Sequence, residues 1–307
     1  MVLGAQAPGR VGRRRIFQEE GRSDTGAVLF FMAGTMPVMP ERSSSGSARR
    51  GRPRTEGSAG PRRSDSRHTG GGTPRTGGGR DFGGPTPPAR KPWSPEGGLP
   101  KWLSDELARV TPKQNIKTAT ELLQSAAQAF AAGRHGKALH DAEEAKELSP
   151  RDATIRELLG LSAYRLGRWD QALRELKTFR RFTGDTTHMP VEMDVLRALD
   201  RPRDVEATWA MFEKIGGDKP TRDEAKVVFG SYLLDAGEDR RAWEVTGPKR
   251  LGAEPGESEL RVWYVAAKAA QRLGDGAIAR KLYETIERAD AAFPGLDELD
   301  RLTGSGA

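Results

Sequence analysis

The chain has 307 residues, with 50 lysines and arginines, 43 aspartates and glutamates, and no cysteine. The lack of cysteine excludes disulfides and thiolate-bound metal, and the chain has no apolar run of the ~20 residues needed to cross a membrane. The charge is unevenly placed, because residues 1–99 carry a net +9 and residues 100–307 a net −2. Any nucleic-acid binding driven by net charge must therefore involve the N-terminal third.

Residues 1–98 form a basic segment rich in glycine, arginine and proline. We expect this tail to be disordered, because it has too little apolar surface to offset the entropy of ordering. Arginines scattered among glycines are similar to arms that bind RNA, whereas many charged tails act only as solubilising linkers. Both interpretations stay open, and the first includes a weak contact with nucleic acid.

The first residues do not match a secretory signal. The apolar run Gly26–Met32 is at the minimum length, two glutamates precede it, and no small-residue cleavage site follows. We interpret residues 1–31 as an over-extended gene start and expect a cytoplasmic protein without membrane contact. Arginine outnumbers lysine 37 to 13, which is typical of high-GC coding and favours a bacterial source.

From Leu99 onward the chain reads as helices. Residues 99–111 predict a short capping helix, and Thr111-Pro112 is a start signal for the next one, with threonine as N-cap. Residues 112–293 then predict a repeat domain, which residues 294–307 follow as a C-terminal tail after Pro294-Gly295. The expected helices are 112–132, 135–148, 153–166, 169–182, 191–199, 202–215, 222–236, 238–245, 259–273 and 276–292.

A recurring turn organises these helices. A glycine leaves one helix, and a small residue packs into the next helix five positions later. Successive turns are separated by 34, 33, 37 and 37 residues, which indicates a helical repeat array. The third turn has Asp200 in place of glycine, and aspartate tolerates the left-handed conformation. With the small residues of the first helices, the predicted packing positions are Gly133, Ala138, Gly160, Gly167, Ala172, Gly230, Gly237, Ala242, Gly274 and Ala279.

The pattern resembles the tetratricopeptide repeat (TPR), through Leu159-Gly160, Phe229-Gly230, Trp263 with Ala266-Ala267, and the alanines after each turn. The resemblance implies an all-α fold: an α-solenoid of about five helix-turn-helix repeats behind a disordered tail. Its first helices would line a concave groove. Glu192-Met193 departs from the motif in the third repeat. The lysine and asparagine of the family's peptide-carboxylate clamp are also absent, so that activity is not carried over.

No catalytic arrangement is evident, and we predict neither enzymatic activity nor a metal or cofactor. The glycines include no phosphate-binding loop. Asp141, Glu143, Glu144 and Glu147 are interpreted as a solvated helix face. The tryptophans of the repeats are interpreted as packing residues: Trp169, Trp209, Trp243 and Trp263.

The predicted function is a non-enzymatic scaffold that binds a peptide of a partner protein of unknown identity. The candidate groove residues are Tyr164, Arg165, Arg197, Leu234, Tyr264, Lys268 and Arg272, with Glu157, Leu161, Asp194, Val227 and Ser231 on the same face. This mixture favours an extended acidic peptide with apolar anchors. The alternatives are that the arginines pair locally with Glu157 and Asp194, that the protein is RNA-associated through its tail, or that it is a regulatory subunit.

Overall fold

The computed structural model describes residues 98–304. These residues form helices joined by turns and loops and contain no strand, so the predicted all-α class is confirmed for this part of the chain. The predicted disordered tail and the interpretation of residues 1–31 lie outside the described residues.

Twelve α-helices and one 3₁₀-helix are present between residues 98 and 304. In chain order they are α1 (Lys101–Val110), η3 (Lys113–Asn115), α2 (Ile116–Ala131), α3 (His135–Leu148), α4 (Ala153–Arg165), α5 (Trp169–Thr183), α6 (Met189–Ala198), α7 (Pro202–Ile215), α8 (Lys219–Asp235), α9 (Asp239–Thr246), α10 (Glu257–Arg272), α11 (Gly276–Ala289) and α12 (Leu296–Gly304).

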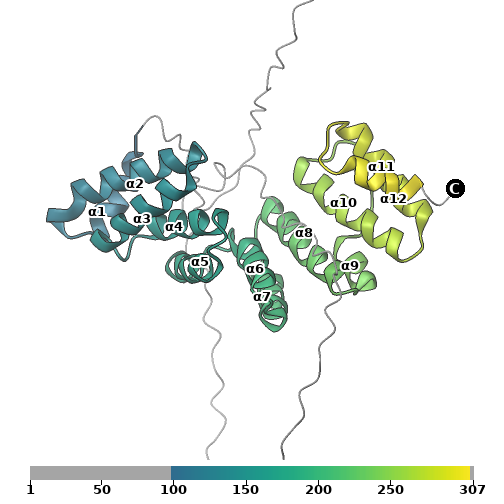
Figure 1. Cartoon of the computed structure of the whole chain (residues 1–307), viewed down its shortest axis with the longest axis horizontal. Coiled ribbons are helices and arrows are strands. Elements are labelled where there is room, and N and C mark those ends of the chain that lie inside the picture. Colours follow the sequence, from purple (N-terminus) through teal and green to yellow (C-terminus); the bar gives the residue numbers. More distant parts are fainter. Residues whose placement is uncertain (1–97, 305–307) are drawn as a thin grey trace, which may run out of the picture.

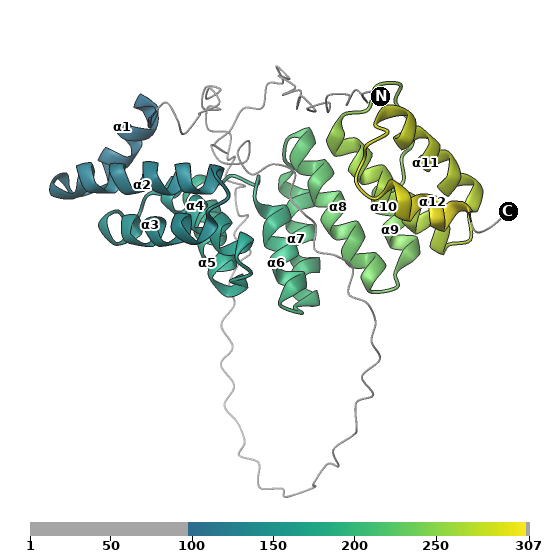
Figure 2. The ribbon, with the colours of Figure 1, turned by 45° about the horizontal axis from the view of Figure 1, so that its top comes forward.

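The helices follow one another along the long axis of the molecule, with α1–α5 at one end and α10–α12 at the other (Figures 1 and 2). Each α-helix packs extensively only on helices at most two places away in the chain. One large apolar cluster runs from α1 to α10, and a second joins α10, α11 and α12. The predicted packing role of the four tryptophans is confirmed, because Trp263 is buried and the other three pack partly buried against these clusters.

The recurring turn has the same geometry in all five places. Gly133, Gly167, Gly237 and Gly274 have φ between 69° and 81°, and Asp200, at φ 56°, is the non-glycine residue with positive φ among the described residues. In every turn, the following N–H donates to the carbonyl five residues earlier, as in Arg134 to Ala129 at 2.8 Å. The other four bonds of this kind are Arg168 to Ala163, Arg201 to Leu196, Glu238 to Leu233, and Asp275 to Ala270. This is the Schellman motif, which requires the left-handed residue.

The small residues occupy close contacts between helices, as predicted. Ala138, Ala172, Ala242 and Ala279 are fully buried. A Cβ added at Gly160 of α4 would lie 2.7 Å from Leu176 Cδ2 and 2.8 Å from Leu176 Cγ. At Gly230 of α8 it would lie 2.5 Å from Thr246 Cγ2. The two glycines therefore let α4 approach α5 and α8 approach α9.

We predict that Gly160→Ala lowers the free energy of unfolding by about 1–3 kcal/mol, because Leu176 is fully buried and has little room to move. Gly136→Ala in α3 is the matched control, since nothing lies within 4 Å of its added Cβ. The control variant should gain about 0.5–1 kcal/mol from the better helix propensity of alanine. Urea unfolding of both variants measures the difference, and equal midpoints would contradict the packing described for α4 and α5.

Four expectations from the sequence are wrong in detail. Thr111 is not an N-cap, because its hydroxyl donates to Leu107 O at 2.6 Å and lies 2.6 Å from Ser149 Oγ, and α2 begins only at Ile116 after a 3₁₀ turn. Ala127, expected on the concave face, is fully buried. Residues 294–307, expected as a tail, contain α12, which packs on α10 and α11.

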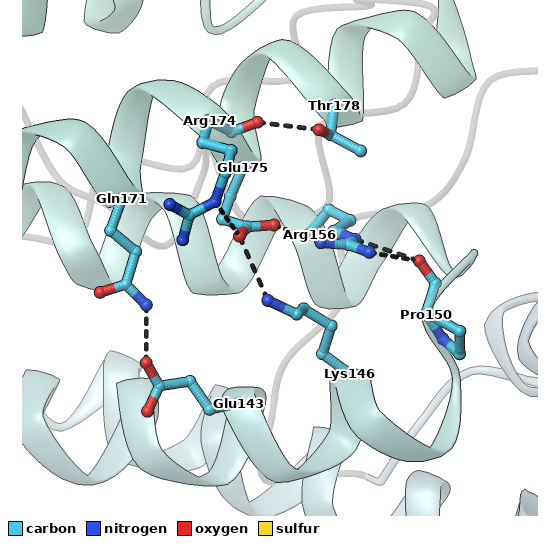
Figure 3. A network of polar contacts seen from close by, with 8 residues as sticks. All are labelled: Glu143, Lys146, Pro150, Arg156, Gln171, Arg174, Glu175 and Thr178. Carbon is cyan, nitrogen blue, oxygen red and sulfur yellow. Dashed lines mark hydrogen bonds and ion pairs between the residues drawn. The ribbon is translucent and has the colours of Figure 1, made fainter.

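The fourth correction concerns the carboxylates of α3, which do not form one solvated face. Asp141 is buried and accepts hydrogen bonds from Ser125 Oγ and Lys137 Nζ, both at 2.6 Å. Glu143 is half-buried and accepts from Gln171 Nε2 of α5 at 2.6 Å (Figure 3). Only the other two carboxylates, Glu144 and Glu147, are exposed.

A buried carboxylate joins α3, α4 and α5. The Glu175 side chain of α5 has no exposed surface and contacts Lys146 Nζ at 3.3 Å, Arg174 Nε at 3.1 Å and Arg156 Nη1 at 2.5 Å (Figure 3). Arg156 also donates to the Pro150 carbonyl. Burial alone would raise the pKa of Glu175, but the surrounding cations outweigh burial and hold this pKa below its usual range. The carboxylate is therefore ionised and links three helices.

Candidate functional site

The candidate groove residues lie along one row of helices formed by α4, α6, α8, α10 and α12, and we call this row's shared side-chain surface the linked face. Its first links join α4, α6 and α8. The Tyr164 hydroxyl donates to Asp194 Oδ2 at 2.6 Å. Arg197 donates to Asp194 Oδ1 at 3.0 Å and to Asp235 Oδ2 at 2.7 Å. Three successive helices of the row are thus tied by hydrogen bonds between their side chains.

The links continue from α8 to α10. Arg272 Nη1 donates to the Leu234 carbonyl at 2.6 Å, and the same atom lies 3.6 Å from Asp239 Oδ1. Arg261 of α10 forms an ion pair with Glu224 of α8 at 2.5 Å. The row of contacts therefore crosses this junction at two places along the helices.

The last links join α10 to α12. The Tyr264 hydroxyl and Lys268 Nζ both donate to the Glu298 carboxylate, at 2.6 and 3.0 Å. Lys268 Nζ also lies 5.5 Å from the centre of the Tyr264 ring. Helix α12, which was not expected from the sequence, therefore supplies the acidic partner for two predicted groove residues.

The seven candidate residues differ in exposure. Tyr164, Leu234 and Lys268 are buried, and Arg272 is exposed. The remaining three, Arg165, Arg197 and Tyr264, are half-buried. Leu161, Val227 and Ser231 of the same face are also buried. The structure thus brings the predicted residues into one row, and it engages three of the four candidate cations with oxygen atoms of neighbouring side chains or backbone.

These contacts weigh against the acidic peptide favoured by the sequence. Arg197 pairs with Asp194, as the local-pairing alternative supposed. Glu157 instead lies 2.7 Å from His188 Nε2, with both side chains buried. Cations already paired to carboxylates steer an acidic ligand weakly, because the pairs cancel much of their field.

Three further residues of the linked face escaped the sequence interpretation: Glu224 of α8, and Glu257 and Arg261 of α10. Glu224 precedes Val227 by three positions, and Arg261 precedes Tyr264 by three. Extending the i, i+3, i+4 stripe toward the N-terminal ends of the helices would have found them.

Carboxylates predominate at the N-terminal halves of these helices. Burial raises the pKa of Glu224, the nearby Asp194 and Glu257 raise it further, and Arg261 opposes them. Among the described side chains at this half of the linked face, six carboxylates accompany the three cations Arg197, Lys219 and Arg261, besides His188. The carboxylates are Glu157, Asp194, Asp223, Glu224, Glu257 and Glu259. This half of the face is therefore net acidic.

Within residues 98–304, no group of three or more histidines, aspartates and glutamates is arranged to hold a metal ion. None of the described helices is both long and apolar enough to cross a membrane. Comparison of the chain with protein-family models, with curated proteins and with solved structures finds no match.

Proposed function

We propose that this protein is a non-enzymatic interaction scaffold: a TPR-like α-solenoid whose linked face binds an extended segment of another protein. The single observation that carries the proposal is the continuous row of contacts along five helices, from Tyr164 on α4 to Glu298 on α12. Helices that pack only on near neighbours in the chain favour a quasi-one-dimensional array with one long binding face.

The chemistry of the face favours a cationic segment with apolar side chains. The net acidic half contributes Glu257, which is exposed, beside the buried Glu224. Leu161, Val227 and Leu234 supply an apolar floor between the polar links. The links fix the side chains in advance, which reduces the entropy lost on binding.

The test compares two charge reversals that differ only in place. Glu257→Lys inverts an exposed charge on the linked face, and Glu213→Lys inverts an exposed charge on α7, outside the row. Affinity purification with the full-length chain, followed by mass spectrometry, should recover a partner with wild type and Glu213→Lys. Recovery with Glu257→Lys should be about fivefold lower, the effect of ~1 kcal/mol. Equal recovery with both variants would place the binding surface elsewhere.

A second candidate function is supported by the charge distribution. The net +9 of residues 1–99, against −2 for the rest, favours nucleic-acid binding by the N-terminal arm with the helices as scaffold. Fluorescence anisotropy with a short single-stranded RNA tests it. Affinity that falls steeply with salt, and is unchanged by Glu257→Lys, would support this function over binding at the linked face.

A further inference from the structure

The linked face is buried although no helix distant in the chain covers it. Leu161, Asp194 and Val227 are each at most 3% exposed. The described helices of the row pack extensively only on helices at most two places away. Such a face, apolar at its floor and acidic at one half, is suited to an extended basic occupant.

The chain itself carries a segment with that chemistry. Residues 49–80 contain nine arginines and only two carboxylates, Glu56 and Asp65. Glycine, serine, threonine and proline make up most of the remainder. An arginine-rich strand of this kind can pair guanidinium groups with carboxylates while its small residues allow the backbone to approach the helices closely.

The connection to the helices is long enough. Residue 98 leads into α1, which packs through Leu103 and Leu107 on the core that α2 shares. Residues 81–97 can span up to roughly 55 Å when extended. Neighbouring packed helices are about 10 Å apart, so this span allows residues 49–80 to reach the row from α4 to α10.

We infer that residues 49–80 of the same chain dock on the linked face and compete there with the partner segment. The inference rests on the proposed function, because it names the regulation of the same surface. The arm would act as an internal competitor: a partner binds only by displacing it, so the apparent affinity falls by the fraction of time that the arm is docked.

The lack of cysteine provides a clean test in the full-length chain. Ser231→Cys places a single thiol on the linked face, and Ala210→Cys places one on the exposed surface of α7. Each reporter is combined with three arms: wild type, all nine arginines of residues 49–80 changed to glutamine, and the same nine changed to lysine. The rate of alkylation of the folded protein is then measured at low and high salt.

The thiol of Ser231→Cys should react about tenfold faster with the glutamine arm than with the wild-type or lysine arm, as expected for a site occupied about nine-tenths of the time. High salt should remove most of this difference by screening the charges. The thiol of Ala210→Cys should react equally in all three. Equal rates for Ser231→Cys with glutamine and wild-type arms would overturn the inference, and so would protection that disappears on dilution, which indicates docking between molecules.

Two further comparisons keep the outcomes separate. Should circular dichroism show that Ser231→Cys does not fold, Ala198→Cys, half-buried at the end of α6 beside Arg197, serves as the reporter with the same expectations. Partner recovery that depends on Glu257 while the thiol rates are unaffected by the arm would refute the docked arm and leave the proposed function standing. Arm-dependent protection without any effect of Glu257→Lys on recovery would support the docked arm and refute the proposed function.

Discussion

Glu175→Ala is expected to lower the free energy of unfolding by about 3–5 kcal/mol, because removal of one partner from a buried ion pair leaves the other charges uncompensated. The carboxylate is fully buried, and the side chains of Lys146 and Arg156, which remain, are only 23% and 15% exposed. Urea unfolding at neutral pH measures the loss. Because the pKa of Glu175 is held low, its contribution is present above the usual glutamate pKa and is lost as the pH falls through the lowered value.

Arg174→Ala is the control for this prediction. Arg174 contacts the same carboxylate at 3.1 Å but is 62% exposed, so its loss should cost no more than about 1 kcal/mol. If the two variants unfold at the same urea concentration, the carboxylate does not link α3, α4 and α5 as described.

Asp152→Asn is expected to stabilise the protein by about 2–3 kcal/mol at pH 7.5 and to change stability little at pH 4. Burial raises the pKa of Asp152 from 3.8 to about 6, with Glu106 and Glu157 adding to the shift against the hydrogen bond from Ile155 N. A carboxyl whose folded-state pKa is raised loses its stabilising contribution as the pH rises from about 4 through about 6. Asparagine keeps the acceptor for the N-cap bond without the buried charge.

Asp218→Asn is the matched control, because Asp218 caps α8 in the same way, with Thr221 N donating to Oδ1 at 2.9 Å, but is exposed. Its substitution should change stability little at either pH. Thermal unfolding across pH 4–8 compares the two caps. A stabilisation by Asp152→Asn that does not vary with pH would contradict the assigned pKa.

The elements that depend on local sequence could be predicted. Positive φ at Asp200 and the glycines of the other turns follows from the residues themselves, because few others adopt the left-handed conformation. The close approach at Gly160 and Gly230 follows from their place before each turn. Such features need only the helical period and the conformational preference of one residue.

Features that depend on distant partners could not be predicted in this way. Glu192 and Asp194 stand where the repeat pattern expects other residues, and only the fold shows Glu192 paired with Arg180 at 2.9 Å and Asp194 with Tyr164. Helix α12 follows Pro294-Gly295, which is a local stop signal, and is stabilised through Leu299 and Glu298 by contacts with α10 and α11. The acidic half of the linked face arises from three helices, and the sequence places these far apart.

The central claim is that the linked face is where this chain binds an extended segment. The most direct measurement is the dissociation constant of the recovered partner segment, titrated against full-length wild type, Glu257→Lys and Glu213→Lys at one ionic strength. The account predicts a constant about fivefold higher for Glu257→Lys, corresponding to ~1 kcal/mol, and an unchanged constant for Glu213→Lys. Equal constants for all three proteins, or weakening by Glu213→Lys alone, would contradict it.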